Sequence, residues 1–579
     1  MVKPIAITTT VCLALAMVVM IAAPNFLAYR TRSSYERPAA IPGQTEPKGT
    51  YARRADADKL AKMPVASAPV ERRAEPFRSG EIVAGKVRTS TDHAFSHQEY
   101  IGRDRFETFD PNPVKRAAEE PVSTFSIDVD TAAYAFVRRA LNNGHLPPIH
   151  AIRIEELINY FDYAYPLPVD RQTPFQPFTA VFPAPWNPEN LLLHIGIKGF
   201  HLIPAQRPKA NLVFLIDVSG SMNMPDKLPL LKNAFRLLVD TLEPEDTVSL
   251  VVYAGAAGTV LEPTSVREKG KILAALENLQ AGGSTAGGAG IRKAYSLAES
   301  HFDPEGVNRV ILATDGDFNV GIRDPEALKN FVERKRHSGI FLSVLGFGQG
   351  NYNDALMQKL AQNGNGNAAY IDSLNEARKV LVDEAGSTLF PIAKDVKIQV
   401  EFNPAMVAKY RLIGYETRQL RREDFNNDRV DAGEIGAGHS VTAIYEITPV
   451  SSPSRLIDDL RYGPGRKEVP VSGAPSGELA FLKIRYKLPD ADTSRLIQKP
   501  ISASEQFSEI GEVPAEARFA AAVAAFGQLL RNDPYTKDFT WDDVLALANT
   551  ARGSDPYGYR AEFLSLVRLA KSARAMGDR

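Results

Sequence analysis

Short apolar runs alternate with amphipathic stretches through the middle of the chain. The runs are apolar on both faces, as in parallel strands that helices cover on both sides. The expected strands are 212–216, 248–253, 259–261, 310–313, 341–347 and 368–371. The helices expected from the 3.6-residue period are 228–241, 267–279, 289–300, 325–337, 353–362 and 375–388. The pattern predicts a doubly wound α/β domain over residues 206–390, in which ligands gather at the carboxyl ends of the strands.

A two-residue period replaces this pattern on both flanks of the α/β domain. Val396, Ile398 and Val400 alternate with polar residues, and 482–486 repeats the pattern. Such alternation predicts half-buried antiparallel strands. Strands expected at 178–182 and 191–197 have a similar character. We therefore predict that residues 119–205 and 391–500 form one antiparallel β-sandwich into which the α/β domain is inserted.

The last part of the chain, residues 501–579, is expected to be helical. Pro514 opens an apolar-faced helix, Thr540 and Asp543 form a capping box for a second, and Asp555 precedes a third.

The N-terminal segment has the pattern of a targeting sequence. No charged side chain lies between Lys3 and Arg30, and this length of apolar helix suffices to span about 30 Å of hydrocarbon. We expect residues 1–29 to be an uncleaved signal anchor, with a cleaved signal peptide and export as the alternative. Residues 30–118 are rich in proline and charge, which predicts a disordered tether. We expect the folded part to be membrane-anchored on the periplasmic side of the cell envelope, a side that the charges flanking the segment (Lys3, against Arg30, Arg32 and Arg37) do not determine.

Composition argues against a nucleic-acid partner and against cysteine-based sites. The 68 basic and 69 acidic residues balance, so no positive field indicates a nucleic-acid partner. The single cysteine, Cys12, lies within the apolar N-terminal segment. The remaining chain therefore has no thiol for a disulfide framework or a cysteine-ligated zinc site.

Hydroxyl and carboxylate side chains follow the expected strands of the α/β domain. Asp217 ends the first strand, and Ser219 and Ser221 come directly after it. Thr285 lies in a glycine-rich loop, and Asp315 ends a later strand. Hard oxygen ligands at one sheet edge suit Mg²⁺, with Mn²⁺ or Ca²⁺ as alternatives.

These five positions resemble the metal-ion-dependent adhesion site of the von Willebrand factor type A (VWA) domain, whose pattern begins Asp-x-Ser-x-Ser. The resemblance implies that Ser219, Ser221 and Thr285 ligate the metal directly or nearly so. It also implies that Asp217 and Asp315 act largely through water, and that an acidic group of a protein partner completes the metal shell.

The flanks carry a second resemblance. Segments 125–131, 155–161 and 424–439 are similar to the bacterial YfbK type of VWA protein. The similarity covers roughly residues 118–575. It implies an N-terminal VWA-associated region and a C-terminal domain of unknown function.

Two further acidic motifs are better explained by structural roles than by catalysis or metal binding. The run 128–131 approaches an aspartyl-phosphate motif but has its threonine one residue early, and Asp130 or Thr131 is expected to cap a helix instead. Residues 424–428 begin like a Ca²⁺ loop, yet Arg429 stands where the turn needs glycine. A polar hairpin turn is the better interpretation.

The leading hypothesis is a non-enzymatic, membrane-tethered module that captures a partner's carboxylate through Mg²⁺. A metal-dependent hydrolase is an alternative and would need Asp315 or Asp317 as its base. Another is a cytoplasm-facing scaffold, since some VWA proteins assist AAA+ ATPases.

Overall fold

The computed structural model describes residues 104–169, 172–202, 207–282, 287–316, 325–350, 352–454 and 477–577. The expected anchor 1–29 and Thr285 lie outside these ranges, as does the expected tether up to residue 103. The tether prediction is wrong for residues 104–118, because Lys115–Arg116 pair with a sandwich strand, Ala117 is buried and Asp104 pairs with Arg139. Within the described ranges, no helix has the length and apolar character needed to cross a membrane.

A six-stranded sheet forms the centre of the α/β domain, with strand order β10-β9-β8-β5-β6-β7. Neighbouring strands are parallel except for β7, which runs antiparallel to β6 at one edge. The strands are β5 (Ala210–Asp217), β6 (Thr247–Tyr253), β7 (Ala257–Ser265), β8 (Val307–Thr314), β9 (Ile340–Phe347) and β10 (Ala368–Ile371).

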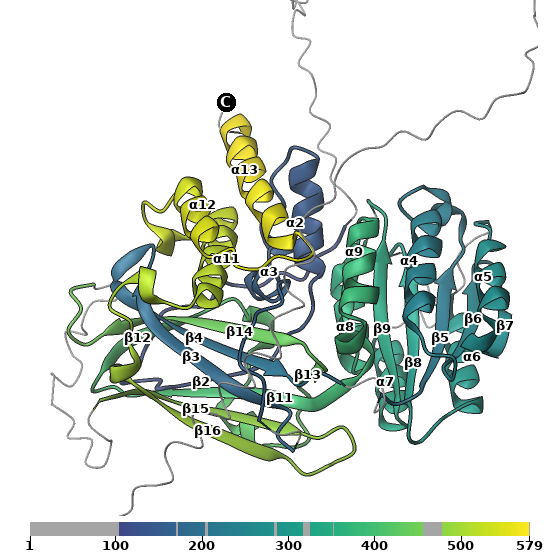
Figure 1. Ribbon diagram of the computed structural model, residues 1–579, viewed down its shortest axis with the longest axis horizontal. Coiled ribbons are helices and arrows are strands. Elements are labelled where there is room, and N and C mark those ends of the chain that lie inside the picture. The colour runs from purple at the N-terminus through teal and green to yellow at the C-terminus, as the bar shows by residue number, and fades with distance from the viewer. Residues whose placement is uncertain are drawn as a thin grey trace, which may run out of the picture. The chain divides into compact units, whose positions relative to one another are not determined.

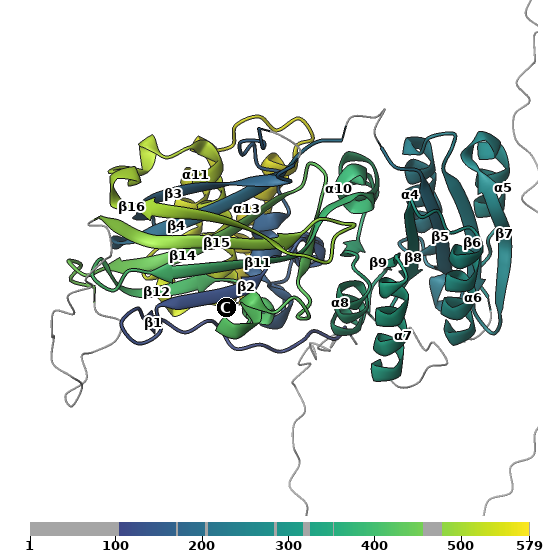
Figure 2. The same cartoon turned by 90° about the horizontal axis from the view of Figure 1, so that it is seen from below.

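Helices cover both faces of this sheet (Figures 1 and 2). Alternate residues of β5 enter different cores: Phe214 packs in the core that contains α4, and Val213 in the core that contains α6. The helices are α4 (Leu228–Thr241), α5 (Lys269–Glu277), α6 (Gly287–Ser300), α7 (Pro325–His337), α8 (Asp354–Asn363), α9 (Leu374–Arg378) and α10 (Ala385–Leu389). The predicted doubly wound α/β fold is confirmed.

One predicted helix, 375–388, is wrong as a continuous element. It is divided into α9, a π-helical turn at Lys379–Asp383, and α10. The wide turn accompanies the burial of Lys379, whose ammonium lies 4.3 Å from the centre of the Tyr160 ring and 2.5 Å from Glu384 Oε1.

Two antiparallel sheets form the β-sandwich. One has the order β1-β12-β14-β4-β3, and the other has β13-β11-β15-β16 with β2 also paired to β11. Both contribute to one apolar core, for example Ile195 from the first sheet and Ile398 from the second. The strands are β1 (Lys115–Arg116), β2 (Val122–Ser126), β3 (Phe175–Ala184), β4 (Asn187–Gly199), β11 (Pro391–Phe402), β12 (Val407–Ile413), β13 (Gly433–Gly436), β14 (Ser440–Pro449), β15 (Glu478–Lys487) and β16 (Arg495–Ser502).

Strands that precede the α/β domain pair directly with strands that follow it. Strand β4 pairs with β14, and β2 pairs with β11. Both flanks therefore belong to the same sandwich, and the α/β domain is inserted between them as predicted.

A helical layer packs on the other face of the first sandwich sheet, where Phe182, Leu192 and Ile444 share a core with Phe526 of the C-terminal helices. Thr540 and Asp543 form the predicted capping box at the start of α12. The helices of this layer are α2 (Ala132–Asn142), α3 (Ile154–Asn159), α11 (Ala515–Arg531), α12 (Trp541–Thr550) and α13 (Tyr559–Gly577).

A buried arginine joins three parts of the chain. Arg138 on α2 is 3% exposed. Its guanidinium donates to Glu376 of α9 at 2.8 Å, to Asp372 at 2.9 Å and to Glu562 of α13 at 3.2 Å. Removing one partner of such a buried cluster leaves uncompensated charge.

We therefore expect Arg138→Met to lower the free energy of unfolding by about 3–5 kcal/mol, measured by urea denaturation. The matched control is Lys571→Met, which breaks the exposed Lys571–Asp542 pair and should change stability little. A comparable small effect at Arg138 would contradict the structural role given to this cluster.

Glu155 predicts a pH dependence of stability. Burial, with Glu416 and Asp128 nearby, raises the pKa of Glu155 to about 8. Between the ordinary carboxyl pKa and this value, the unfolded chain ionises Glu155 while the native protein keeps it protonated, so its contribution to stability falls as pH rises. Glu155→Gln should therefore gain thermal stability relative to the parent chain from pH 5 to pH 8. An equal difference in melting temperature at both pH values would refute this.

Candidate metal centre

The turn after β5 brings together three of the predicted side chains. Asp217, the last residue of β5, is fully buried, and its Oδ1 accepts a 2.8 Å hydrogen bond from the Ser219 amide. A short 3₁₀ turn at Gly220–Asn223 follows and holds the Ser221 hydroxyl 3.0 Å from that of Ser219. Because β5 lies in the middle of the sheet, this turn is at the centre of the carboxyl edge.

The neighbouring strand β8 delivers the second carboxylate. Asp315 follows its last residue and is buried. Gly316 then turns the chain with φ of +105°, a conformation that glycine adopts without strain. Thr314 Oγ1 donates to Asp217 Oδ2 at 3.4 Å, so the ends of β5 and β8 are joined. The structure thus brings Asp217, Ser219, Ser221 and Asp315 to one edge.

The electrostatics of this edge reflect two buried acids. Burial, together with the nearby charge of Asp315, raises the pKa of Asp217 to about 6. Hydrogen bonds from Ser219 and Tyr253 oppose the rise. A cation at this edge would relieve both the burial penalty and the repulsion.

Thr285, the fifth predicted residue, lies outside the described residues. The segments on either side of it contact the site. Gly282 donates its amide to the Val218 carbonyl at 2.8 Å. Gly290, in the first turn of α6, packs against Tyr253 so closely that a Cβ there would come within 2.9 Å of the Tyr253 Cβ.

Three residues of the site were not predicted. Tyr253 and Thr314 could have been found, because they end β6 and β8 at the same sheet edge as the predicted side chains. Lys227 carried no such signal. Its Nζ donates to Asp315 Oδ2 at 2.8 Å from the residue that precedes α4.

The donor set fits a small divalent cation. Adjacent ligands of an octahedral Mg²⁺ with bonds of about 2.0–2.1 Å are about 2.9 Å apart, close to the 3.0 Å between the Ser219 and Ser221 hydroxyls. Ser219, Ser221, Asp217 and Asp315 would hold the ion, which would supply a Lewis-acidic position for an anionic oxygen. The ranges covered by the structure contain no cluster of three or more His, Cys, Asp or Glu side chains arranged for a metal. The candidate site therefore depends on hydroxyls as well as carboxylates.

Two polar cavities lie beside β13. The larger, about 180 Å³, is lined by Asp128, Asp130 and Arg418. These residues pair with one another: Arg418 donates to Asp128 at 2.9 Å and to Asp130 at 2.8 Å. Thr131 occupies the N-cap position of α2, as expected, but its side chain makes no cap bond. Asp130 instead accepts from Arg418 and the Ala368 amide.

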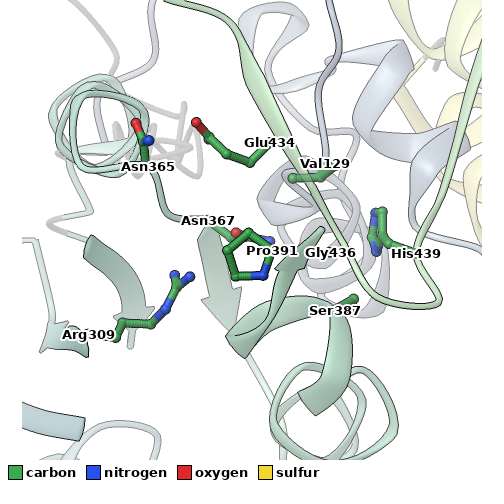
Figure 3. A pocket seen from close by; sticks show the side chains of 9 residues that line it. All are labelled: Val129, Arg309, Asn365, Asn367, Ser387, Pro391, Glu434, Gly436 and His439. Atoms are coloured by element: carbon green, nitrogen blue, oxygen red, sulfur yellow. The ribbon is translucent and has the colours of Figure 1, made fainter. Parts of the chain in front are cut away.

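The smaller pocket holds about 10 Å³ and is shown in Figure 3. Arg309 and Asn365 lie on one side of it and His439 on the other. That volume is about the space of one water molecule. The pocket is too small for an organic ligand, and the carboxyl edge of the α/β sheet remains the candidate site.

Family models match three consecutive parts of the chain. The von Willebrand factor type A domain matches residues 211–383, and a further von Willebrand factor model matches 100–194. The model for the C-terminal part of the uncharacterized protein YfbK matches 387–573. The sheet and its carboxyl-edge cluster therefore define a VWA-domain protein.

Similar proteins extend this result. Uncharacterized protein YfbK of Escherichia coli is 46% identical over 475 residues, which is 81% of each chain. Human inter-alpha-trypsin inhibitor heavy chain H4 is 30% identical over 33% of this chain and 21% of its own. Among solved structures, BatB from Bacteroides thetaiotaomicron is 25% identical over 30% of this chain and 97% of its own, with a TM-score of 0.26. The chain belongs to the YfbK family of VWA-domain proteins.

The close packing of α6 against β6 predicts a sharp cost for enlarging Gly290. In Gly290→Ala, the new methyl group would overlap Tyr253 and Leu215, and we expect a loss of about 1–3 kcal/mol in unfolding free energy. Gly270→Ala in α5 is the control, because a Cβ there meets open space and alanine favours helix. Urea denaturation that gives the two variants the same stability would contradict this packing.

Proposed function

We propose that this protein is a metal-dependent protein-binding module whose α/β domain captures an acidic group of a partner through Mg²⁺. The observation that carries the proposal is the cluster at the carboxyl edge. Two hydroxyls lie at octahedral ligand spacing there, beside the buried Asp217 and Asp315. VWA domains are commonly metal-dependent interaction modules, which supports the same conclusion.

Binding is favoured over hydrolysis because of how Asp315 is held. A hydrolase would need a free base near a metal-bound water. Asp315 is buried and its Oδ2 already accepts a hydrogen bond from the Lys227 ammonium, so this carboxylate is not a free base. An anionic oxygen of a partner would instead replace one metal-bound water, and the surrounding loops would set the specificity.

The proposed setting is the cell envelope. The uncharged stretch 4–29 would anchor the protein in the membrane, and the segment that follows it, up to about residue 103, would hold the folded part away from it. A reporter fused to the C-terminus would test this orientation; cytoplasmic activity of the fusion would favour the scaffold alternative.

We expect Asp217→Ala to lower Mg²⁺ affinity by on the order of 10–100-fold, because the carboxylate orients Ser219 and neutralises the ion. Mg²⁺ should raise the melting temperature of the parent protein and not of the variant. Ser221→Ala removes an exposed hydroxyl without entering the core and should also weaken binding, whereas Asp240→Ala on the surface of α4 should not.

Partner capture is tested in the same series. A crosslinking pull-down in Mg²⁺ should retain a partner that EDTA and Asp217→Ala both release. Binding indifferent to chelator and to Asp217 would refute the proposal.

A further inference from the structure

Lys227 stands at a position that helix stability does not favour. It immediately precedes α4, as the N-cap residue, and makes no side-chain cap bond. A cation near a helix N-terminus faces the positive end of the helix dipole, and lysine is not among the side chains that cap this end well. The side chain is nevertheless only 7% exposed.

The lysine is held firmly at the metal site. Its ammonium lies 2.8 Å from Asp315 Oδ2. Its aliphatic stem runs against Gly348, where a Cβ would come within 2.2 Å of the Lys227 Cε. Gly348 has φ of +76°, and its carbonyl accepts from Arg139 of α2 at 3.2 Å. The ammonium is thus a fixed part of the site, buttressed by the flanking region.

The fixed ammonium sets the charge balance of the site. Asp217, Asp315 and Lys227 together carry a net charge of −1 when both carboxylates are ionised. A divalent cation changes this to +1, which attracts one carboxylate. Without Lys227, the loaded site would be neutral and the partner's carboxylate would bring it to a net negative charge.

From this geometry we infer that Lys227 has opposite effects on the two ligands of the site. It lowers the affinity for the divalent cation and raises the affinity of the metal-loaded site for a singly charged carboxylate. The inference rests on the proposed function and adds a residue that tunes it. The lysine acts through its positive charge close to both ligands and through its hydrogen bond to Asp315.

The test measures both affinities in the full chain. Mn²⁺ serves as the metal probe and acetate as the carboxylate. Water-proton relaxation reports Mn²⁺ binding, and it reports the loss of a metal-bound water when acetate binds. In Lys227→Met we expect Mn²⁺ to bind on the order of tenfold more tightly, and acetate to bind the Mn²⁺-loaded protein on the order of tenfold more weakly. Lys227→Arg keeps the charge and should resemble the parent protein in both measurements.

A second readout comes from thermal unfolding. Without metal, Lys227→Met should melt at a lower temperature than the parent protein, since the buried Asp315 loses its ion pair with the Lys227 ammonium. Mn²⁺ should then raise its melting temperature by more than it raises that of the parent.

Different results would contradict the inference about Lys227 and the proposed function. If Lys227→Met weakens both Mn²⁺ and acetate binding, or changes neither, Lys227 is only structural and the inference is wrong while the proposed function stands. If the parent protein does not bind Mn²⁺, or if Asp217→Ala binds it equally well, the proposed function and the inference are both overturned.

Discussion

The hydrogen-bonded pairing of β4 with β14 is the constraint on which the rest of the fold depends. It joins Ser440–Ile447 to Leu191–Lys198, across the whole α/β domain in sequence. The pairing of β2 with β11 repeats the connection in the second sheet. Neither sandwich sheet is complete without strands from both flanks, so the chain that enters the α/β domain and the chain that leaves it are held together.

The segments that flank the α/β domain in sequence also contact it in the fold. Helix α2 follows β2 and places two arginines against the α/β domain. Arg138 pairs with Asp372 and Glu376 beyond β10. Arg139 reaches the Gly348 carbonyl, behind the lysine that holds Asp315. Helix α2 of the flanking region is therefore in contact with Gly348, the residue against which Lys227 of the candidate site packs.

Much of this architecture follows from local pattern. Helices α4 and α7 have the bounds that their apolar period predicts, and the two-residue period finds β11 and β15. The candidate cluster is equally accessible from sequence, because Asp217 directly follows an apolar run and only Thr314 separates Asp315 from another. The local pattern of apolar and polar residues does not predict contacts between distant segments of the chain. In the π-helical turn, the Lys379 ammonium contacts Tyr160 and Glu384, and elsewhere Asp130 pairs with Arg418. Lys227 looks like an ordinary surface lysine in the sequence, because its contacts with Asp315 after β8 and Gly348 after β9 arise only in the fold.

The central claim is that a divalent cation binds at the carboxyl edge of the inserted sheet. Anomalous diffraction from crystals grown with Mn²⁺ tests it most directly. The account predicts a strong peak in contact with the Ser219 and Ser221 hydroxyls, with Asp217 and Asp315 around it. At saturating Mn²⁺, the lack of a peak at this edge, or a peak only elsewhere in the molecule, would contradict it.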